Sequence, residues 1–175
     1  MGLTEEHNIK PDNVAEITLR VTDTTKTFCE PLEERRRPPS AIDAKVALPF
    51  TAAVALVRRK VTLAEYLAET LKNPQVLALS SRVNYLAEPG FGHRNLEPAG
   101  VIIKCKDGRE YGRYIEYSYG HPLNPISKED LIAKFKDCCG YSVKPVCEKN
   151  QNRVIYMVTH LEEVSNVGEI ISLLG

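Results

Sequence analysis

Hydrophobic and polar positions follow two periods along this chain, and each period predicts a kind of element. Between residues 15 and 21 apolar and polar side chains alternate, which is typical of a strand with one buried face. A further strand is predicted at residues 82–86. Residues 101–117 are predicted to form a hairpin, because Asp107 and Gly108 in its middle suit a tight type I′ turn.

The most apolar stretch, residues 40–59, is predicted to be a helix. Ser40 and Asp43 stand three positions apart, as in a capping box that satisfies free N–H groups at a helix start. Pro49 cannot donate a hydrogen bond to the carbonyl of Lys45, so we expect a kink there. The kink would separate a core-packed half from a half that faces a ligand or partner.

Other helix starts carry capping residues as well. Thr62 and Glu65 resemble a second capping box, and Asn73 precedes a proline, which is favoured at the first helical position. Ser127 opens an amphipathic segment that Gly140 closes. Further helices are expected at residues 74–80, 147–161 and 167–174.

The order of these elements predicts the fold class. A strand, several helices, a three-strand meander and more helices follow one another, which is typical of an α+β protein. We expect a small antiparallel β-sheet of three to four strands with helices packed against it. The 175 residues suffice for one ordinary core, so a single domain over residues 1–175 is expected.

The charge balance argues against two classes of partner. The chain has 23 basic and 23 acidic side chains without a long block of one sign, so neither nucleic acid nor an anionic membrane is expected as a partner. The longest uncharged apolar run, residues 46–57, is shorter than the roughly 20 residues of a membrane span. The N-terminus shows no signal-peptide core. We therefore expect a cytoplasmic protein.

Five cysteines, without a C-x-x-C pair, suggest neither a disulfide framework nor a zinc site. Cys138 and Cys139 are adjacent and could be redox-active. However, Leu131, Phe135 and these two cysteines recur at the spacing of one helix face. We interpret the two cysteines as reduced core thiols.

Spacing alone identifies no self-contained active site, because the motifs of nucleotide binding, of metalloproteases and of serine hydrolases are absent. His93 and His121 lie in loops near Gly and Pro. Two interpretations stay open for them, a catalytic residue or an inert surface residue. Arg35, Arg36 and Arg37 form a dense basic patch, which is either a solvated loop or a site for an anionic ligand.

Four segments resemble the second domain of the MmgE/PrpD family, in the family's order: EEHNIKPDNVAEITLRV, PPSAIDAKVALPFTAAVAL, KDGREYGRYIEYSYGHPLNPISKEDLIAKF and VTHLEEVSNVGEIISLL. The family comprises lyases and isomerases such as 2-methylcitrate dehydratase, cis-aconitate decarboxylase and iminodisuccinate epimerase. The resemblance implies the smaller lid domain of such an enzyme, which acts on small di- or tricarboxylates without a metal or other cofactor. It also implies a partner, the large helical domain that carries most of the family's catalytic residues.

The resemblance implies roles for a few residues. Lys45 matches a basic position of the family and is expected to attract a polycarboxylate. Phe50 stands where the family often has a tyrosine, so an aromatic wall is expected without a hydroxyl for proton transfer. Arg37 and His121 are further candidates for substrate binding, and no residue is assigned as catalytic. The alternative for Lys45 is an ordinary ion pair with a nearby carboxylate: Asp43, Glu33 or Glu34.

Two functions stay open at this point. The first is a lid domain or small subunit of an MmgE/PrpD-type lyase or isomerase, which needs a helical domain or subunit for catalysis and could also form homo-oligomers. The second is a non-catalytic carboxylate-binding or regulatory module with the same fold. A self-sufficient enzyme is less favoured, because no pair of acid and base can be assembled from the residues present.

Overall fold

The structure is a computed structural model that describes residues 2–88 and 98–175. The chain forms two compact units, Met1–Pro125 and Ile126–Gly175. The boundary between them follows the proline-rich turn after the predicted hairpin.

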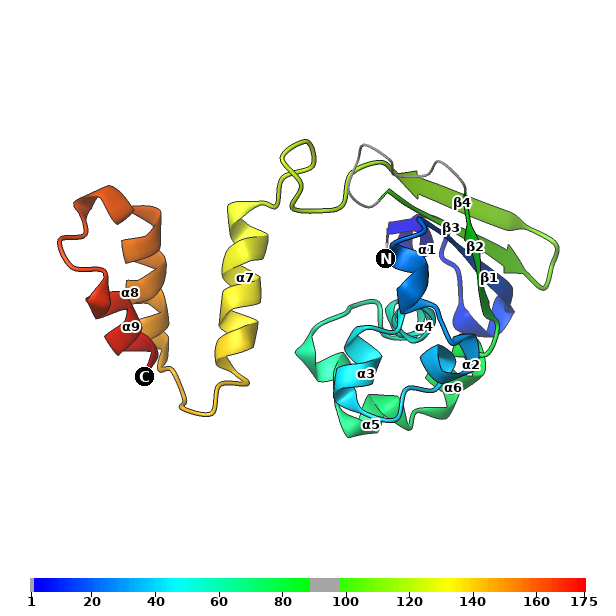
Figure 1. The fold of residues 1–175 in the computed structure, drawn as a ribbon, viewed down its shortest axis with the longest axis horizontal. Helices are drawn as coiled ribbons and strands as arrows, with labels where there is room; N and C mark the ends of the chain where they lie inside the picture. The colour runs from blue at the N-terminus through cyan, green and yellow to red at the C-terminus, as the bar shows by residue number, and fades with distance from the viewer. Residues whose placement is uncertain (1, 89–97) are drawn as a thin grey trace. The chain divides into compact units, whose positions relative to one another are not determined.

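The first unit is built on a four-stranded sheet in the order β2-β1-β3-β4 (Figure 1). Strands β3 and β4 form the predicted hairpin, and β1 pairs antiparallel with β3. β1 and β2 are parallel, so the sheet is mixed rather than purely antiparallel. The cause is the long helical connection between β1 and β2, which returns the chain to the end of the sheet where β1 began. The strands are β1 (Val14–Val21), β2 (Val83–Ala87), β3 (Ala99–Cys105) and β4 (Glu110–Ile115).

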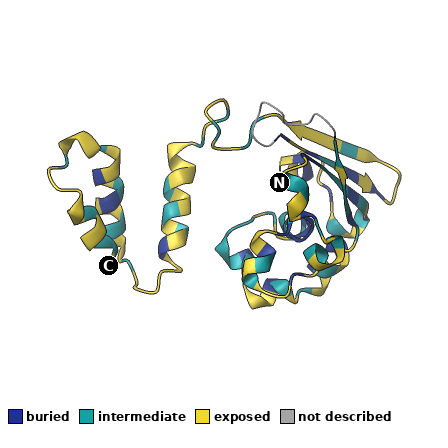
Figure 2. Cartoon of the chain, viewed as in Figure 1, coloured by how far each residue is buried: buried dark blue, intermediate teal, exposed yellow. Residues whose placement is uncertain are grey.

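Helices cover one face of this sheet, which confirms the predicted α+β class (Figures 1 and 2). Phe50 and Val54 of α4 and Val76 of α6 join Ile17 of β1 and Val83 of β2 in one buried hydrophobic cluster. The α-helices of the first unit are α1 (Gly2–Glu6), α2 (Leu32–Arg36), α3 (Ala41–Lys45), α4 (Leu48–Arg58), α5 (Ala68–Leu71) and α6 (Pro74–Ser80). Short 3₁₀ helices span Pro11–Asn13, Thr25–Phe28 and Leu63–Tyr66.

The alternation predicted for residues 15–21 is shifted at its start. A register irregularity between Val14 and Glu16 places Val14 in the core and leaves Ala15 exposed. A bulge adds one residue to one strand, so the side chains before it change face. From Ile17 onward the buried face of β1 follows the predicted period.

The apolar stretch at residues 40–59 is two helices rather than one kinked helix. α3 ends at Lys45, and α4 begins at Leu48 with Pro49 in its first turn. A proline is tolerated there, because the first N–H groups of a helix have no partner within the helix. The predicted kink at Pro49 is therefore replaced by a break at Val46 and Ala47.

The predicted capping residues are confirmed. The side chains of Ser40, Asn73 and Ser127 each accept a hydrogen bond from a backbone N–H of the helix that follows. Thr62 and Glu65 form both bonds of a capping box, although the helix they open is a single 3₁₀ turn. Local side-chain chemistry thus fixed the helix starts, while the length of each helix depended on packing.

The second unit contains three helices, α7 (Lys128–Cys139), α8 (Glu148–Thr159) and α9 (Gly168–Leu174), and a 3₁₀ turn at Leu161–Glu163. Most of its residues are half-buried or exposed (Figure 2). Cys139 is buried, but Cys138 and Leu131 are exposed, so the interpretation of Cys138 as a core thiol was wrong. Among the described residues, no helix combines the length and the apolar character that crossing a membrane requires.

Candidate functional site

The four residues predicted to bind substrate all lie in the first unit, on separate elements. Arg37 directly follows α2, Lys45 ends α3, Phe50 belongs to α4, and His121 lies in the turn after β4. Among the described residues, no hydrogen bond or ion pair joins any two of these four. Arg37 and Lys45 come from consecutive short helices, whereas His121 comes from a distant part of the sequence.

Lys45 is an exposed cation at the C-terminal end of the short helix α3. Its ammonium group forms no ion pair with any described residue. The carboxylates weighed as its partners have other contacts: Asp43 accepts a hydrogen bond of 2.6 Å from Ser40, and Glu33 pairs with Arg36 at 2.6 Å. The Lys45 charge is therefore available to a ligand.

Phe50 is fully buried, with 0% of its surface exposed. Its ring packs in the main hydrophobic cluster of the first unit, beside Ala53 and Val54 of the same helix. A ligand has no access to the ring in this structure. We therefore assign a packing role to Phe50, and the binding role predicted for it from the resemblance stays a prediction that our proposal does not use.

The basic patch lies at the end of helix α2 rather than in a loop, since α2 includes Arg35 and Arg36 and Arg37 is its C-cap. Arg36 donates to the carbonyl of Val83 at 3.0 Å and to the amide oxygen of Asn84 at 2.7 Å, which ties α2 to strand β2. Arg35 donates to the carbonyl of Glu30 at 3.0 Å. The Arg37 side chain is exposed and forms no ion pair with a described residue. Of the three, Arg37 is the one available to an anionic ligand.

His121 lies half-buried in a compact turn. Its Nδ1 accepts a hydrogen bond of 3.1 Å from the N–H of Leu123, and its ring stacks on Tyr117 at 4.7 Å between centroids. Asn124 holds the turn through a 2.9 Å bond from its amide to the carbonyl of Tyr117. Because Nδ1 is an acceptor, the neutral ring carries its proton on Nε2 and can donate it to a carboxylate. His93 lies outside the described residues.

Sequence reasoning missed a contact between Tyr85 on β2 and Glu30 before α2. The Tyr85 hydroxyl donates to the Glu30 carboxylate, and Lys26 lies 3.5 Å from the same carboxylate. The Tyr85 bond, and then the Lys26 charge, lower the pKa of Glu30, while the bond raises the pKa of Tyr85. The two residues lie far apart in the sequence, so no local pattern could have indicated the pair.

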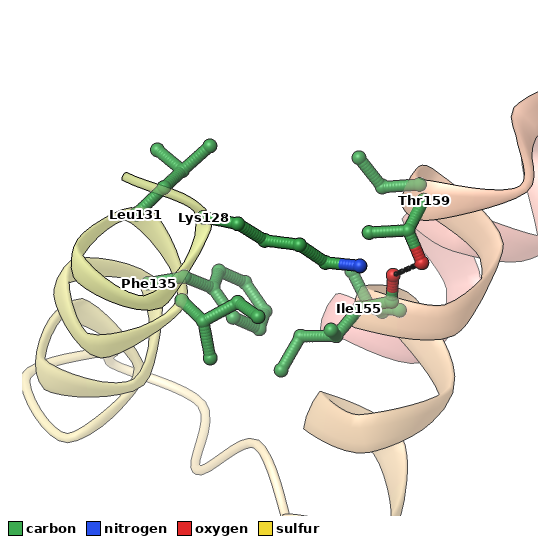
Figure 3. Close-up of a pocket in the computed structure, with 8 residues that line it drawn as sticks. Lys128, Leu131, Phe135, Ile155 and Thr159 are labelled. Atoms are coloured by element: carbon green, nitrogen blue, oxygen red, sulfur yellow. Dashed lines mark hydrogen bonds between the residues drawn. The ribbon is translucent and has the colours of Figure 1, made fainter. Parts of the chain in front are cut away.

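The second unit has an apolar groove between α7 and α8 (Figure 3). Leu131 and Phe135 of α7 face Ile155 of α8 across it, and Lys128 is the charged residue of its lining. The Thr159 hydroxyl is occupied by a 2.9 Å bond to the carbonyl of Ile155. With a largely apolar lining, this groove offers little to bind or transform a carboxylate.

No group of three or more His, Cys, Asp or Glu side chains in residues 2–88 and 98–175 is arranged to hold a metal ion. Of the predicted binding residues, Lys45 and Arg37 thus supply exposed cations and His121 supplies an oriented imidazole, which can bind an anion. They offer no assembled acid and base pair.

The fold and these residues define an α+β domain that presents cationic groups. The family model of the MmgE/PrpD C-terminal domain matches residues 1–162, and the chain belongs to this family. It is similar to cis-aconitate decarboxylase of Mus musculus, with 25% identity over 175 residues, which cover 98% of this chain and 34% of the relative. The chain thus spans about a third of the length of that curated relative.

Proposed function

We propose that this chain is the lid domain, or a small subunit, of an MmgE/PrpD-type lyase or isomerase. Its substrate is a small di- or tricarboxylate such as 2-methylcitrate, and catalysis requires a helical domain. The observation that carries this proposal is the family match along residues 1–162, which extends through the segment holding Lys45 and the turn holding His121. The similarity to a decarboxylase of a tricarboxylate supports the same substrate class.

The chemistry of such an enzyme removes a proton next to a carboxylate, after which water or carbon dioxide departs. This step needs a base, an acid and cations that stabilise the negative charge of the intermediate. Lys45 and Arg37 are exposed and unpaired with described residues, so they suit the cationic role toward the substrate's carboxylates. The Nε2–H of His121 suits a hydrogen bond to one carboxylate. The base and acid come from the helical domain.

Steady-state kinetics of the chain assembled with its helical domain test this assignment. Lys45→Gln and His121→Gln are expected to raise KM for the carboxylate substrate by about tenfold each, because each removes a charge or a donor from the substrate. Lys60→Gln is the matched control, since Lys60 pairs with Glu65 of the capping box at 3.5 Å. This substitution is expected to leave KM unchanged. Equal KM values for all variants would contradict the assignment.

One observation favours the second candidate, a non-catalytic carboxylate-binding module. At the position where the family often has a tyrosine, this chain has Phe50, which is buried and brings no hydroxyl. A binding module would keep the cations and lose turnover. Calorimetric titration with citrate, combined with a turnover assay of the assembled protein, separates the two: binding without turnover supports the module, and turnover rules it out.

A further inference from the structure

A hollow of about 380 Å³ in the first unit is lined mainly by polar side chains. The segment between α1 and β1 forms one wall and contributes His7, Asn8, Lys10 and Asn13. The hairpin of β3 and β4 forms the other wall and contributes Arg109. The described lining thus contains a lysine, an arginine, an imidazole and two amides, but no carboxylate. Its volume lies in the range of small-molecule sites.

Both walls are held in place by contacts with the rest of the first unit. Ile9, with 3% of its surface exposed, anchors the first wall in the core, and Arg59 donates a hydrogen bond to its carbonyl. The carbonyl of Asn13 accepts a 2.7 Å bond from the N–H of Lys106, which ties this wall to the hairpin. Because the hollow is formed before any ligand arrives, binding would require little reordering.

The guanidinium of Arg109 has a fixed orientation. Its Nε and Nη2 donate to Asp107 at 3.1 and 2.7 Å, and Asn13 donates to the same carboxylate at 2.8 Å. The bonds from Arg109, and then the bond from Asn13, hold the pKa of Asp107 well below its usual range, so this pairing persists at neutral pH. Asp107 offsets one positive charge. The Nη1 group of Arg109 forms no hydrogen bond with a described residue and is left for a ligand.

The remaining positive charge comes from Lys10, which is exposed and forms no ion pair with a described residue. His7 stacks on Tyr111 at 4.4 Å between ring centroids, which fixes the position of its imidazole. Two carboxylates lie beside the lining: Asp107, bonded to Arg109 and Asn13, and Glu6, which lies 3.8 Å from His7 and is itself bonded to Arg113. The hollow is therefore cationic and has oriented donors.

We propose that this hollow binds a small multivalent oxyanion, the chemistry shared by polycarboxylates and inorganic phosphate. The unoccupied Nη1 group of Arg109 and the ammonium group of Lys10 match such an anion, and the amide of Asn8 adds a donor. This is a binding site beyond the proposed function, because its lining includes none of Arg37, Lys45 and His121.

Isothermal titration calorimetry of the full chain at constant ionic strength tests the proposal. Citrate and inorganic phosphate are titrated separately, and acetate serves as the singly charged reference. Lys10→Gln is expected to weaken binding by about tenfold, since it removes a charged donor. Lys106→Gln is the matched control, because Lys106 is an exposed neighbour on the hairpin whose side chain does not line the hollow. Circular dichroism confirms that both variants fold.

Binding of citrate, phosphate or both that is weakened by Lys10→Gln and not by Lys106→Gln supports the proposal and identifies the anion. Acetate binding as tight as that of citrate and phosphate, equal affinities in both variants, or no heat with the parent chain would overturn it. Heat that is lost in Lys45→Gln but kept in Lys10→Gln would also overturn it and would assign binding to the residues of the proposed function instead.

Discussion

The Nδ1 atom of His121 accepts a hydrogen bond of 3.1 Å from the N–H of Leu123, whereas the Nδ1 of His160 lies 2.9 Å from the carbonyl oxygen of Tyr156. A carbonyl only accepts, so the contact with Tyr156 favours a proton on Nδ1 of His160, and the Thr159 hydroxyl lies 3.1 Å from the same atom. The Leu123 N–H favours the opposite neutral tautomer for His121, with the proton on Nε2.

Long-range proton–nitrogen NMR spectra of the chain at a pH where both rings are neutral check this contrast. We expect the Nε2–H tautomer for His121 and the Nδ1–H tautomer for His160. His121→Gln and His160→Gln assign the two signals. If His121 carries its proton on Nδ1 instead, its Nε2 has no proton to donate, which would contradict the hydrogen bond proposed from His121 to the substrate.

Phe50 is expected to be a stability residue. Phe50→Ala should lower the free energy of unfolding by about 3–5 kcal/mol, because it leaves a cavity in the main core. Urea denaturation followed by circular dichroism measures the change. Ile42→Ala is the control at a site with 77% exposure, where a change within about 0.5 kcal/mol is expected. Similar costs at the two sites would contradict the packing role.

Glu65 is expected to contribute pH-dependent stability. Its burial acts to raise the pKa, but the two hydrogen bonds from Thr62 and the charge of Lys60 outweigh burial and lower the pKa of Glu65. A carboxyl whose pKa is lower in the folded state stabilises the fold above its unfolded pKa of about 4.3. That contribution is lost as the pH falls through the lower, folded pKa.

Glu65→Gln should therefore destabilise the chain by about 1 kcal/mol at neutral pH, and the difference should shrink below about pH 4. Urea titrations of both proteins between neutral and acidic pH measure it. Glu69→Gln is the control, since the Glu69 side chain is 88% exposed and its ion pair with Arg58 is long, at 3.8 Å. A destabilisation by Glu65→Gln that grows toward acidic pH would contradict a lowered pKa of Glu65 in the folded protein.

The cysteines are expected to react in two groups. Cys138 and Cys147 are exposed and should react quickly with a thiol reagent in the folded protein. Cys29 and Cys105 are buried, and burial raises the pKa of both, to about 11 for Cys29, so they should react only after unfolding. Mass spectrometry after timed labelling distinguishes the sites, with the urea-unfolded chain as the reference. Rapid labelling of Cys29 would contradict the core assignment.

The parts of the fold that could be predicted from sequence are those fixed by neighbouring residues. Asp107 and Gly108 indicated the hairpin, and Ser40, Asn73 and Ser127 indicated helix starts, because a turn or a cap depends on a few adjacent groups. The order of strands and helices indicated the α+β class, and the family resemblance added the likeness to a lid domain.

What could not be predicted depends on residues far apart in the chain. The parallel pairing of β1 with β2 and the break between α3 and α4 are set by how the helices pack on the sheet. Lys45 and Phe50 are close in sequence, yet Lys45 is exposed and Phe50 is buried. One helical period drawn through residues 40–59 ignores the break between α3 and α4, so it could not show this difference. Lys10 and Arg109 line the same hollow because the pairing of β1 with β3 and the bonds of Asn13 bring distant segments together.

The central claim is that this chain completes an MmgE/PrpD-type enzyme together with a helical domain. The most direct test measures consumption of 2-methylcitrate and cis-aconitate by the chain alone and by the chain assembled with a helical MmgE/PrpD domain from the same source, as a partner or in one polypeptide. Our account predicts turnover of a small carboxylate by the assembled protein and none by the chain alone. Equal turnover by the chain alone, or no turnover by a correctly folded assembly with any di- or tricarboxylate tested, would contradict it.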